Sequence, residues 1–320
     1  MKQRLFVCMV LVASMLAACK NEDIDISRKV SFDVHPYTAV SDFVRYEVNP
    51  GDLSAFKYDE HPDHYQLRTY LLVYDADGKL VNSRIDDLKN FNDRMSASFE
   101  LLDGYYTVVS LCHVYCEKEA LAYWSVQDME SLSSLKLLNN DDYYDDWTKA
   151  LGLKTVKVEV GCGLESHTVN LQPAVALMVN YFLNIHYYPN IKAYRPYANK
   201  MPKMISFNDQ GECHAIYEES VEPNYPLTSP LETNVSSDNL YWYYCFTPLK
   251  TTNFKWVGQA MDGQVYTLGE TRSADIRAGK VYQSVINLQT GVFKIEELKE
   301  GKEFLLLDNC NKMDMIINLD

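Results

Sequence analysis

Short runs that alternate hydrophobic and polar residues recur along the chain, and turn-forming residues separate them. Residues 70–74 (Tyr-Leu-Leu-Val-Tyr) lead through residues 75–78 (Asp-Ala-Asp-Gly) into residues 79–81 (Lys-Leu-Val). β-Branched and aromatic residues favour strands, whereas Asp and Gly adopt the backbone conformations that tight turns require. The pattern therefore predicts a β-hairpin over residues 70–81.

The same arrangement occurs a second time, nearer the C-terminus. After the first hairpin comes the segment 101–111, in which Gly104 directly precedes a long alternating strand. In the second copy, residues 254–266 contain the turn Asp262-Gly263, and Gly279 then precedes a strand-like segment that ends at Leu288. Duplication of one β-unit explains this order, and many short strands with turns between them are typical of a sandwich of two sheets.

The pattern also suggests where the parts of the chain begin and end. Two glycines interrupt strand-like residues at 159–163, and the apolar segments 168–171 and 174–185 follow as the expected start of a second core. Lys118–Leu138 has rough helical spacing and predicts a short helical insertion. The predicted organisation is a signal peptide (1–18), a lipidated tether (19–29), an N-terminal β-sandwich (30–163), a C-terminal β-sandwich (164–290) and a C-terminal strand extension (291–320).

The first residues have the pattern of an export signal. Lys2 and Arg4 precede an uncharged apolar run over residues 5–16, which is too short to span a bilayer but has the length of a signal-peptide core. The run ends in Leu-Ala-Ala-Cys, which resembles the lipobox of bacterial lipoproteins, where the cysteine is acylated and the chain is cut before it. Cys19 is therefore the predicted lipidation site, carrying acyl chains such as palmitate; the alternative is a plain secreted protein.

Residues 20–23 (Lys-Asn-Glu-Asp) bear on where the mature protein is displayed. They resemble the surface-export signal of Bacteroidota-type lipoproteins, and the alternative is a solvated tether. We expect a lipid-anchored protein of the outer membrane that is exposed at the cell surface.

Composition and charge limit the kinds of partner that the protein can have. The chain is 47% hydrophobic with 24 tyrosines, enough to build packed cores, and its net charge is −14. Basic residues are scattered rather than clustered, which argues against nucleic acid or an anionic lipid surface as a partner.

The sequence does not determine which cysteines form disulfides. Of eight, Cys8 lies in the signal segment and Cys19 is the lipidation site, which leaves six and fifteen possible pairings. Cys112 and Cys116 on one strand would lie about 13 Å apart, too far for a disulfide with each other. Buried free thiols are the simplest interpretation for most of the six.

Several segments contain residue types that bind metals, and each also has a structural explanation. The acidic run 139–146 lacks the glycine bend of a calcium loop, and residues 75–78 are better explained as a turn. In residues 112–116 (Cys-His-Val-Tyr-Cys), His113 on a strand would point away from both cysteines. His61 and His64 lack a nearby third ligand. We therefore expect no metal and no cofactor.

Catalytic motifs are also missing from the sequence. It contains no Gly-x-Ser-x-Gly, no His-Glu-x-x-His and no phosphate-binding glycine loop, so we expect a protein that is not an enzyme and has no catalytic residues, an extracellular hydrolase being the remote alternative. The aromatic groups at 187–188 and 241–244 could stack on carbohydrate, although alternation more simply places half of them in the core. Binding of glycan or matrix is thus the alternative function.

Several of these segments together resemble a known family. The lipobox, the hairpin YLLVYDADGKLV, the strand LLDGYYTVVSL, the junction VNLQPAVALMVNYFLNI and the closing strand IRAGKVYQSVINL are similar to the FimB-like, fimbrillin-associated anchor and minor subunits of Bacteroidota-type fimbriae. The resemblance implies two tandem transthyretin-like β-sandwich domains and a role in anchoring or terminating a fimbrial polymer at the outer membrane. At the junction, Gln172-Pro173 stand where the family often has an arginine.

The resemblance also implies partners, namely the fimbrial shaft or accessory subunits. Polymers of this kind grow when an extended segment of one subunit completes the sheet of another. Residues 304–307 and 313–317 of the tail are candidate donor segments; the alternative is that the tail pairs within its own domain.

Overall fold

The computed structural model describes residues 26–36, 65–89, 93–117, 120–122, 124–140, 151–161, 165–184, 187–188, 190–227, 231–232, 240–246 and 249–297. Within these ranges the chain is built from β-strands and turns, and no α-helix is present. The part of the chain that is described therefore contains no helix of the length and apolar character that crossing a membrane requires.

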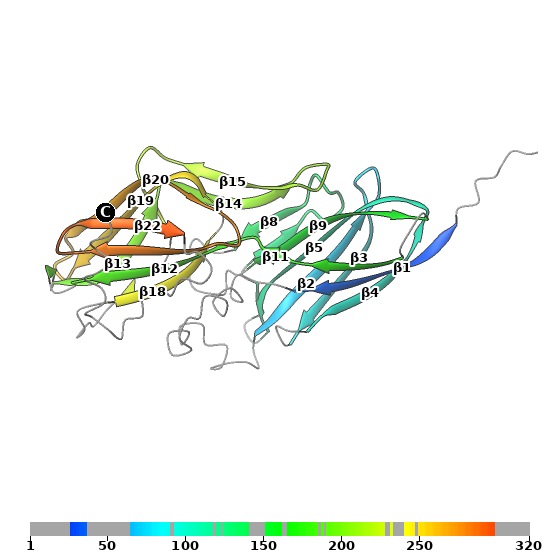
Figure 1. Ribbon diagram of the computed structural model, residues 1–320, viewed down its shortest axis with the longest axis horizontal. Helices are drawn as coiled ribbons and strands as arrows, with labels where there is room; N and C mark the ends of the chain where they lie inside the picture. Colours follow the sequence, from blue (N-terminus) through cyan, green and yellow to red (C-terminus); the bar gives the residue numbers. More distant parts are fainter. Residues whose placement is uncertain are drawn as a thin grey trace, which may run out of the picture.

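Two sheets form a first sandwich, on the right of Figure 1. In the smaller one, sheet I, β1 (Ser27–His35) lies between β10 (Ser166–Asn170) and β4 (Met95–Leu102). Sheet II has the order β11 (Gln172–Pro173), β9 (Leu151–Val160), β5 (Gly104–Cys116), β2 (Tyr65–Tyr74), β3 (Leu80–Leu88), and β6 (Leu121–Ala122) pairs with β5.

Both faces of sheet II are buried, because successive side chains of a strand point to opposite faces. Val73 of β2 and Val108 of β5 pack against sheet I, in a core that also contains Phe32. The neighbouring Leu72 and Val109 point the other way, into a second and larger core. Near-continuous hydrophobic sequence in these strands reflects burial on two sides.

The second sandwich lies on the left of Figure 1. Sheet III has the order β18 (Leu240–Phe246), β12 (Ala176–Leu183), β21 (Val281–Asn287), β22 (Val292–Glu297). Sheet IV has the order β16 (Tyr225–Pro226), β13 (Ile191–Ala198), β19 (Leu249–Ala260), β20 (Val265–Ile276), with β17 (Leu231–Glu232) also on β13.

Aromatic side chains join the two sheets of the second sandwich. The ring of Phe182 on β12 lies 4.9 Å from that of Tyr194 on β13 and 4.8 Å from that of Trp256 on β19, between centroids. The Phe182–Trp256 contact is edge-to-face, an arrangement that the charge distribution of aromatic rings favours.

A fifth sheet bridges the two sandwiches. Its order is β15 (Cys213–Glu219), β14 (Lys200–Phe207), β8 (Lys136–Asn139), β7 (Trp124–Gln127), so a hairpin from the second half of the chain pairs with one from the first half. We call β14–β15 the arm; in Figure 1 it runs from the second sandwich over the first. The larger core is continuous from Leu67 in β2 to Phe293 in β22.

Both predicted hairpins are confirmed. β2 and β3 pair around the Asp75–Gly78 turn, and β19 and β20 pair around the turn that contains Gly263. Gly78 has φ +75° and Gly263 φ +85°, conformations that glycine adopts without steric cost.

The predicted helical insertion over Lys118–Leu138 is wrong. Its described residues include β7 and β8, which pair with each other through residues 124–127 and 136–139. Leu135 and Leu137 are both fully buried two residues apart, a strand period rather than a helical one. Pairing of β8 with the distant β14 satisfies the backbone of this segment, so tertiary context outweighed its helix-forming residues.

The change from the first sandwich to the second lies later than residue 163. Ser166–Asn170 forms β10, which pairs with β1 in sheet I, and Gln172–Pro173 forms β11, which pairs with β9 in sheet II. Thr168–Leu171 thus belongs to the first sandwich and not to the start of the second core. β12 is the first strand of the second sandwich.

Candidate functional site

The candidate functional site is the end of the molecule where the predicted tether enters the fold. Cys19 and the rest of residues 1–25 lie outside the described residues. The first strand, β1, begins at Ser27, at the end of the long axis farthest from the second sandwich (Figure 1). A load applied through the preceding residues would therefore reach the protein at this point.

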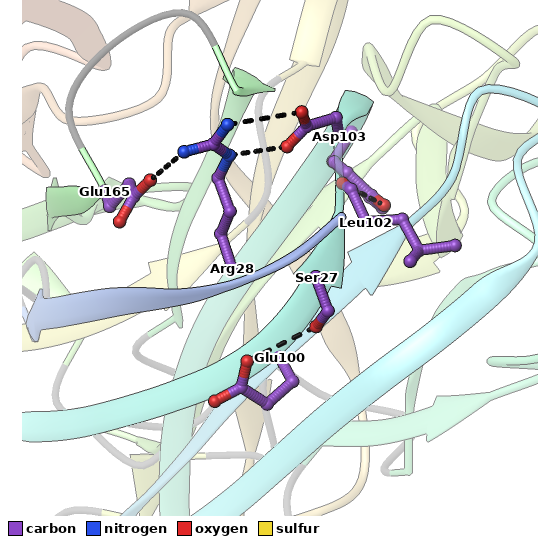
Figure 2. A network of polar contacts seen from close by, with 7 residues as sticks. Ser27, Arg28, Glu100, Leu102, Asp103 and Glu165 are labelled. Carbon is purple, nitrogen blue, oxygen red and sulfur yellow. Dashed lines mark hydrogen bonds and ion pairs between the residues drawn. The ribbon is translucent and has the colours of Figure 1, made fainter. Parts of the chain in front are cut away.

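Arg28 lies at the centre of a polar network on β1 (Figure 2). Its guanidinium donates from Nε to Oδ1 of Asp103 at 2.6 Å and from Nη2 to Oδ2 at 3.4 Å, and Nη1 donates to Oε1 of Glu165 at 3.3 Å. The hydrogen bond with Asp103 is the main cause that raises the pKa of the Arg28 guanidinium. The network ties the first residues of β1 to the turn between β4 and β5 and to the residue before β10.

Further hydrogen bonds hold the start of β1 against β4 and the turn that follows it. Asp103 donates its backbone N–H to the carbonyl of Ile26 at 3.1 Å, and the Ser27 hydroxyl donates to Glu100 Oε2 at 3.3 Å. Gly161 has φ +106°, and a Cβ there would come within 2.7 Å of the Asp103 carboxyl group. Glycine at this position therefore lets the Asp103 side chain lie against the end of β9.

β1 is held along both edges. It pairs antiparallel with β4 over Ser27–Val34 and parallel with β10 over Ser31–His35. Hydrogen bonds between strands run roughly across the strand axis, so a pull along β1 loads many of them together. A strand placed in this way resists being drawn out of the sheet better than an edge strand does.

Strand edges are the second feature relevant to a polymer. β22, the last described strand, lies at the edge of sheet III and pairs with β21 over Val292–Glu297. An edge strand leaves one row of backbone groups for another strand to pair with. The candidate donor segments 304–307 and 313–317 lie outside the described residues.

The predicted opposite facing of Cys112 and His113 on sheet II is confirmed. Cys112 lies in the core between sheets I and II, whereas the His113 ring lies 5.7 Å from that of Tyr70 on the other face. Burial is the main cause that lowers the pKa of His113 to about 4, and its Nδ1 donates to the Val114 carbonyl at 3.0 Å. Within the described ranges, no three His, Cys, Asp or Glu side chains gather as metal ligands would.

Asp75, Tyr187 and residues 241–244 are further candidates, for metal or carbohydrate binding. Asp75 Oδ1 accepts the backbone N–H groups of Asp77 and Lys79, so this carboxyl group supports the turn, as predicted. Tyr187 is 48% exposed. The strand that contains residues 241–244 is β18. The acidic run is described only at its first two residues, and His61 and His64 lie outside the described part.

Sequence reasoning missed the Arg28 network. Asp103 and Glu165 are 75 and 137 residues away from Arg28, and surface charges are common in this chain. No local pattern marks an arginine whose partners come from two distant segments, because only the pairing of β1 with β4 and β10 brings those segments to it.

No family model and no curated protein matches this chain. Solved structures do show likeness, at low identity. The fimbrial anchor protein Mfa2 from Porphyromonas gingivalis is 12% identical, with 81% of this chain and 91% of that chain covered and a TM-score of 0.44. The tip fimbrial protein Mfa3 from the same organism is 11% identical, with 85% and 99% covered and a TM-score of 0.43.

A fimbrial assembly protein from Parabacteroides distasonis is 10% identical, with 85% of this chain and 99% of that chain covered and a TM-score of 0.41. The structural neighbours of this chain include fimbrial anchor, tip and assembly proteins and proteins described as putative adhesins.

Proposed function

We propose that this protein is a lipid-anchored fimbrial subunit, held in the outer membrane through Cys19 and displayed at the cell surface, where it anchors or terminates a fimbrial polymer. Its role is structural and adhesive rather than catalytic. In this proposal the two sandwiches are the transthyretin-like domains of the family that the sequence resembles. The segment between Cys19 and β1 is the tether that joins them to the membrane.

The observation that carries the proposal is the predicted signal peptide, residues 1–18, followed by Cys19. A positive start, the uncharged run 5–16 and Leu-Ala-Ala-Cys occur in the order that lipoprotein export requires. Several acyl chains on one cysteine anchor a protein stably, because each buried methylene contributes about 0.8 kcal/mol.

The mechanics of the first sandwich support an anchoring role. The tether would enter at β1, a strand paired on both sides, and Arg28 binds β1 to two neighbouring segments at the point of entry. The bridging sheet and the shared core then connect this sandwich to the second one. A pull at the membrane would be passed along the whole body without a flexible joint between the sandwiches.

Mass spectrometry of the native N-terminus tests the anchoring step. We expect a mature chain that begins at an acylated Cys19 and fractionates with the outer membrane. Cys19→Ser should abolish acylation, release the protein from the membrane and release fimbriae into the medium. Cys213→Ser, which alters an exposed cysteine of the folded body, is the matched control and should change none of these. An unmodified thiol at residue 19 of the native protein would contradict the proposal.

The polymer contact is tested separately by truncation. Because β22 pairs within its own sandwich, the chain should be cut after Glu297 so that this strand is kept. If residues 298–320 serve assembly, the truncated protein should melt at the same temperature as the full chain but no longer co-purify with a polymer subunit from solubilised membranes. Loss of the cooperative melt would instead show that the tail pairs within its own domain.

A further inference from the structure

The described part of the molecule contains a hollow of about 460 Å³ where the arm ends on the first sandwich. We call it the junction hollow. Its lining comes from three segments that are far apart in sequence: the β2–β3 turn with Asp75, the paired strands β5 and β9 with Tyr105, Thr107, Lys157 and Glu159, and the arm tip with Asp209. It lies within the range of size of small-molecule sites.

The hollow exists because the arm covers only part of sheet II. Gly211 in the arm tip lies against sheet II: its carbonyl accepts the Thr155 hydroxyl at 2.8 Å, and a Cβ on it would come within 3.0 Å of Thr107. In the β5–β9 register, the next pair beyond Thr107 is Tyr105 opposite Glu159. Both side chains are exposed, and the Tyr105 side chain is 66% exposed.

The polar groups that line the hollow include both a hydrogen-bond donor and hydrogen-bond acceptors. Lys157 Nζ donates to the hydroxyl of the buried Thr107 at 2.6 Å, which holds the ammonium against sheet II with further N–H groups to donate. Asp75, Glu159 and Asp209 also line the hollow, and of the Asp75 carboxyl group Oδ1 accepts two backbone N–H groups of its own turn. The lining thus combines acceptors from three segments of the chain with one donor that Thr107 holds.

This combination selects a class of ligand. A sugar ring has C–H groups that pack on the face of an exposed aromatic ring and hydroxyl groups that both donate and accept hydrogen bonds. The lining residues carry three carboxyl groups and one ammonium, so an anionic saccharide would be repelled. We propose that the junction hollow binds a neutral saccharide, with the ring stacked on Tyr105 and its hydroxyl groups bonded to Lys157 and the surrounding carboxylates.

This site is independent of the anchoring role proposed above, since it uses neither Cys19 nor the tail. It would give the protein a glycan-binding surface where the tip of the arm meets the first sandwich. Because Asp209 belongs to the arm, part of the site comes from the second half of the chain and part from the first.

Isothermal titration of the full mature chain with neutral hexasaccharides of glucose, mannose, xylose and N-acetylglucosamine tests the proposal. A sulfated chondroitin hexasaccharide is the anionic comparison. At least one neutral probe should bind. Tyr105→Ala and, as a second variant, Lys157→Met should each weaken that binding by about tenfold or more, which corresponds to the loss of one good contact.

Tyr187→Ala is the matched control, because it removes a comparably exposed tyrosine from the second sandwich and should change the affinity less than about twofold. The proposal is overturned by any of three results. These are no binding of the neutral probes at about 10 mM, tighter binding of the sulfated probe, or equal effects of Tyr105→Ala and Tyr187→Ala. All three variants alter exposed side chains, and thermal melts should show that each keeps the fold.

Discussion

The two sandwiches have the same strand order but different outer surfaces. In the first, β10-β1-β4 faces β9-β5-β2-β3; in the second, β21-β12-β18 faces β20-β19-β13-β16. Each unit also contains one parallel pair, β1 with β10 and β12 with β21, in the same place. The duplication that the sequence predicts is therefore present in the topology.

The equivalent hairpins are not the ones that the sequence pattern matched. By strand order, β19–β20 with its Gly263 turn corresponds to β5 and β9 of the first unit and not to β2–β3 with its Gly78 turn. A turn motif of Asp and Gly recurs wherever two strands reverse, so it identifies a hairpin without identifying which one.

The units differ in where each carries an extra hairpin. The first has β7–β8 between β5 and β9, and the second has the arm between β13 and β16. These two insertions pair with each other in the bridging sheet and cover the outer face of sheet II. The corresponding face of sheet IV carries Tyr197 with the cationic groups of Arg195 and Lys255 each 5.7 Å from its ring centroid. Insertions thus turned two similar units into one joined body.

The largest effect should come from removing a side chain that covers sheet II. Trp124 of β7 is 1% exposed in the larger core, and Trp124→Ala should lower the free energy of unfolding by about 3–5 kcal/mol, the usual cost of a buried aromatic. Tyr197→Ala, at a half-buried position on the outer face of sheet IV, should cost less, about 1–2 kcal/mol. Urea unfolding followed by circular dichroism compares them. Equal losses would mean that the two outer faces contribute alike.

Acid should affect the first sandwich through His113. Its pKa is lowered from 6.5 to about 4 by burial, with Arg68 lowering it further and Asp87 opposing. Between pH 6.5 and 4 the unfolded chain takes up a proton that the folded chain excludes, so stability should fall by about 3 kcal/mol as pH decreases through this window.

His113→Phe removes the titrating group and keeps a ring against Tyr70, so it should abolish that part of the pH dependence. Denaturant unfolding at pH 7, 6, 5 and 4 measures the slope. The same slope in the variant would assign the acid sensitivity to other groups.

The contact of the arm with sheet II can be isolated with two glycines. Gly211 and Gly263 both have positive φ, but a Cβ on Gly211 would come within 2.7 Å of Thr155, whereas a Cβ on Gly263 would meet nothing within 4 Å. Gly263→Ala should cost about 1 kcal/mol for the backbone alone, and Gly211→Ala about 2 kcal/mol because the arm tip must also shift. Thermal melts of both variants compare them, and an equal cost would mean that the tip is not in tight contact.

The smallest equilibrium effect should follow Arg28→Ala, since the side chain lies at the surface. Under load the effect should be larger. In single-molecule pulling between residue 20 and residue 297, the variant should unfold the first sandwich at lower force. Arg84→Ala removes an exposed arginine–aspartate pair on β3, away from the tether, and should leave the force unchanged. Equal unfolding forces for the wild type and Arg28→Ala would argue against a load-bearing network at β1.

Local sequence determined the hairpins and the all-β class. Alternation in residues 70–74 and the Asp-Gly turns set which side chains can share a face, and these are properties of neighbouring residues. The opposite facing of Cys112 and His113 followed from the same two-residue period. Leu-Ala-Ala-Cys at residues 16–19, the basis of the proposed anchor, is likewise a local signal.

Only the tertiary structure decided how distant segments pair. It placed residues 166–170 beside β1, made strands of the predicted helix by pairing β8 with β14, and brought Asp103 and Glu165 to Arg28. It also formed the junction hollow, whose lining residues come from three separate segments. A backbone group can pair with any strand that offers a free edge, and the partner is chosen by which arrangement buries the most apolar surface. That choice depends on the whole chain at once, so the sequence of a single segment does not predict its partner strand.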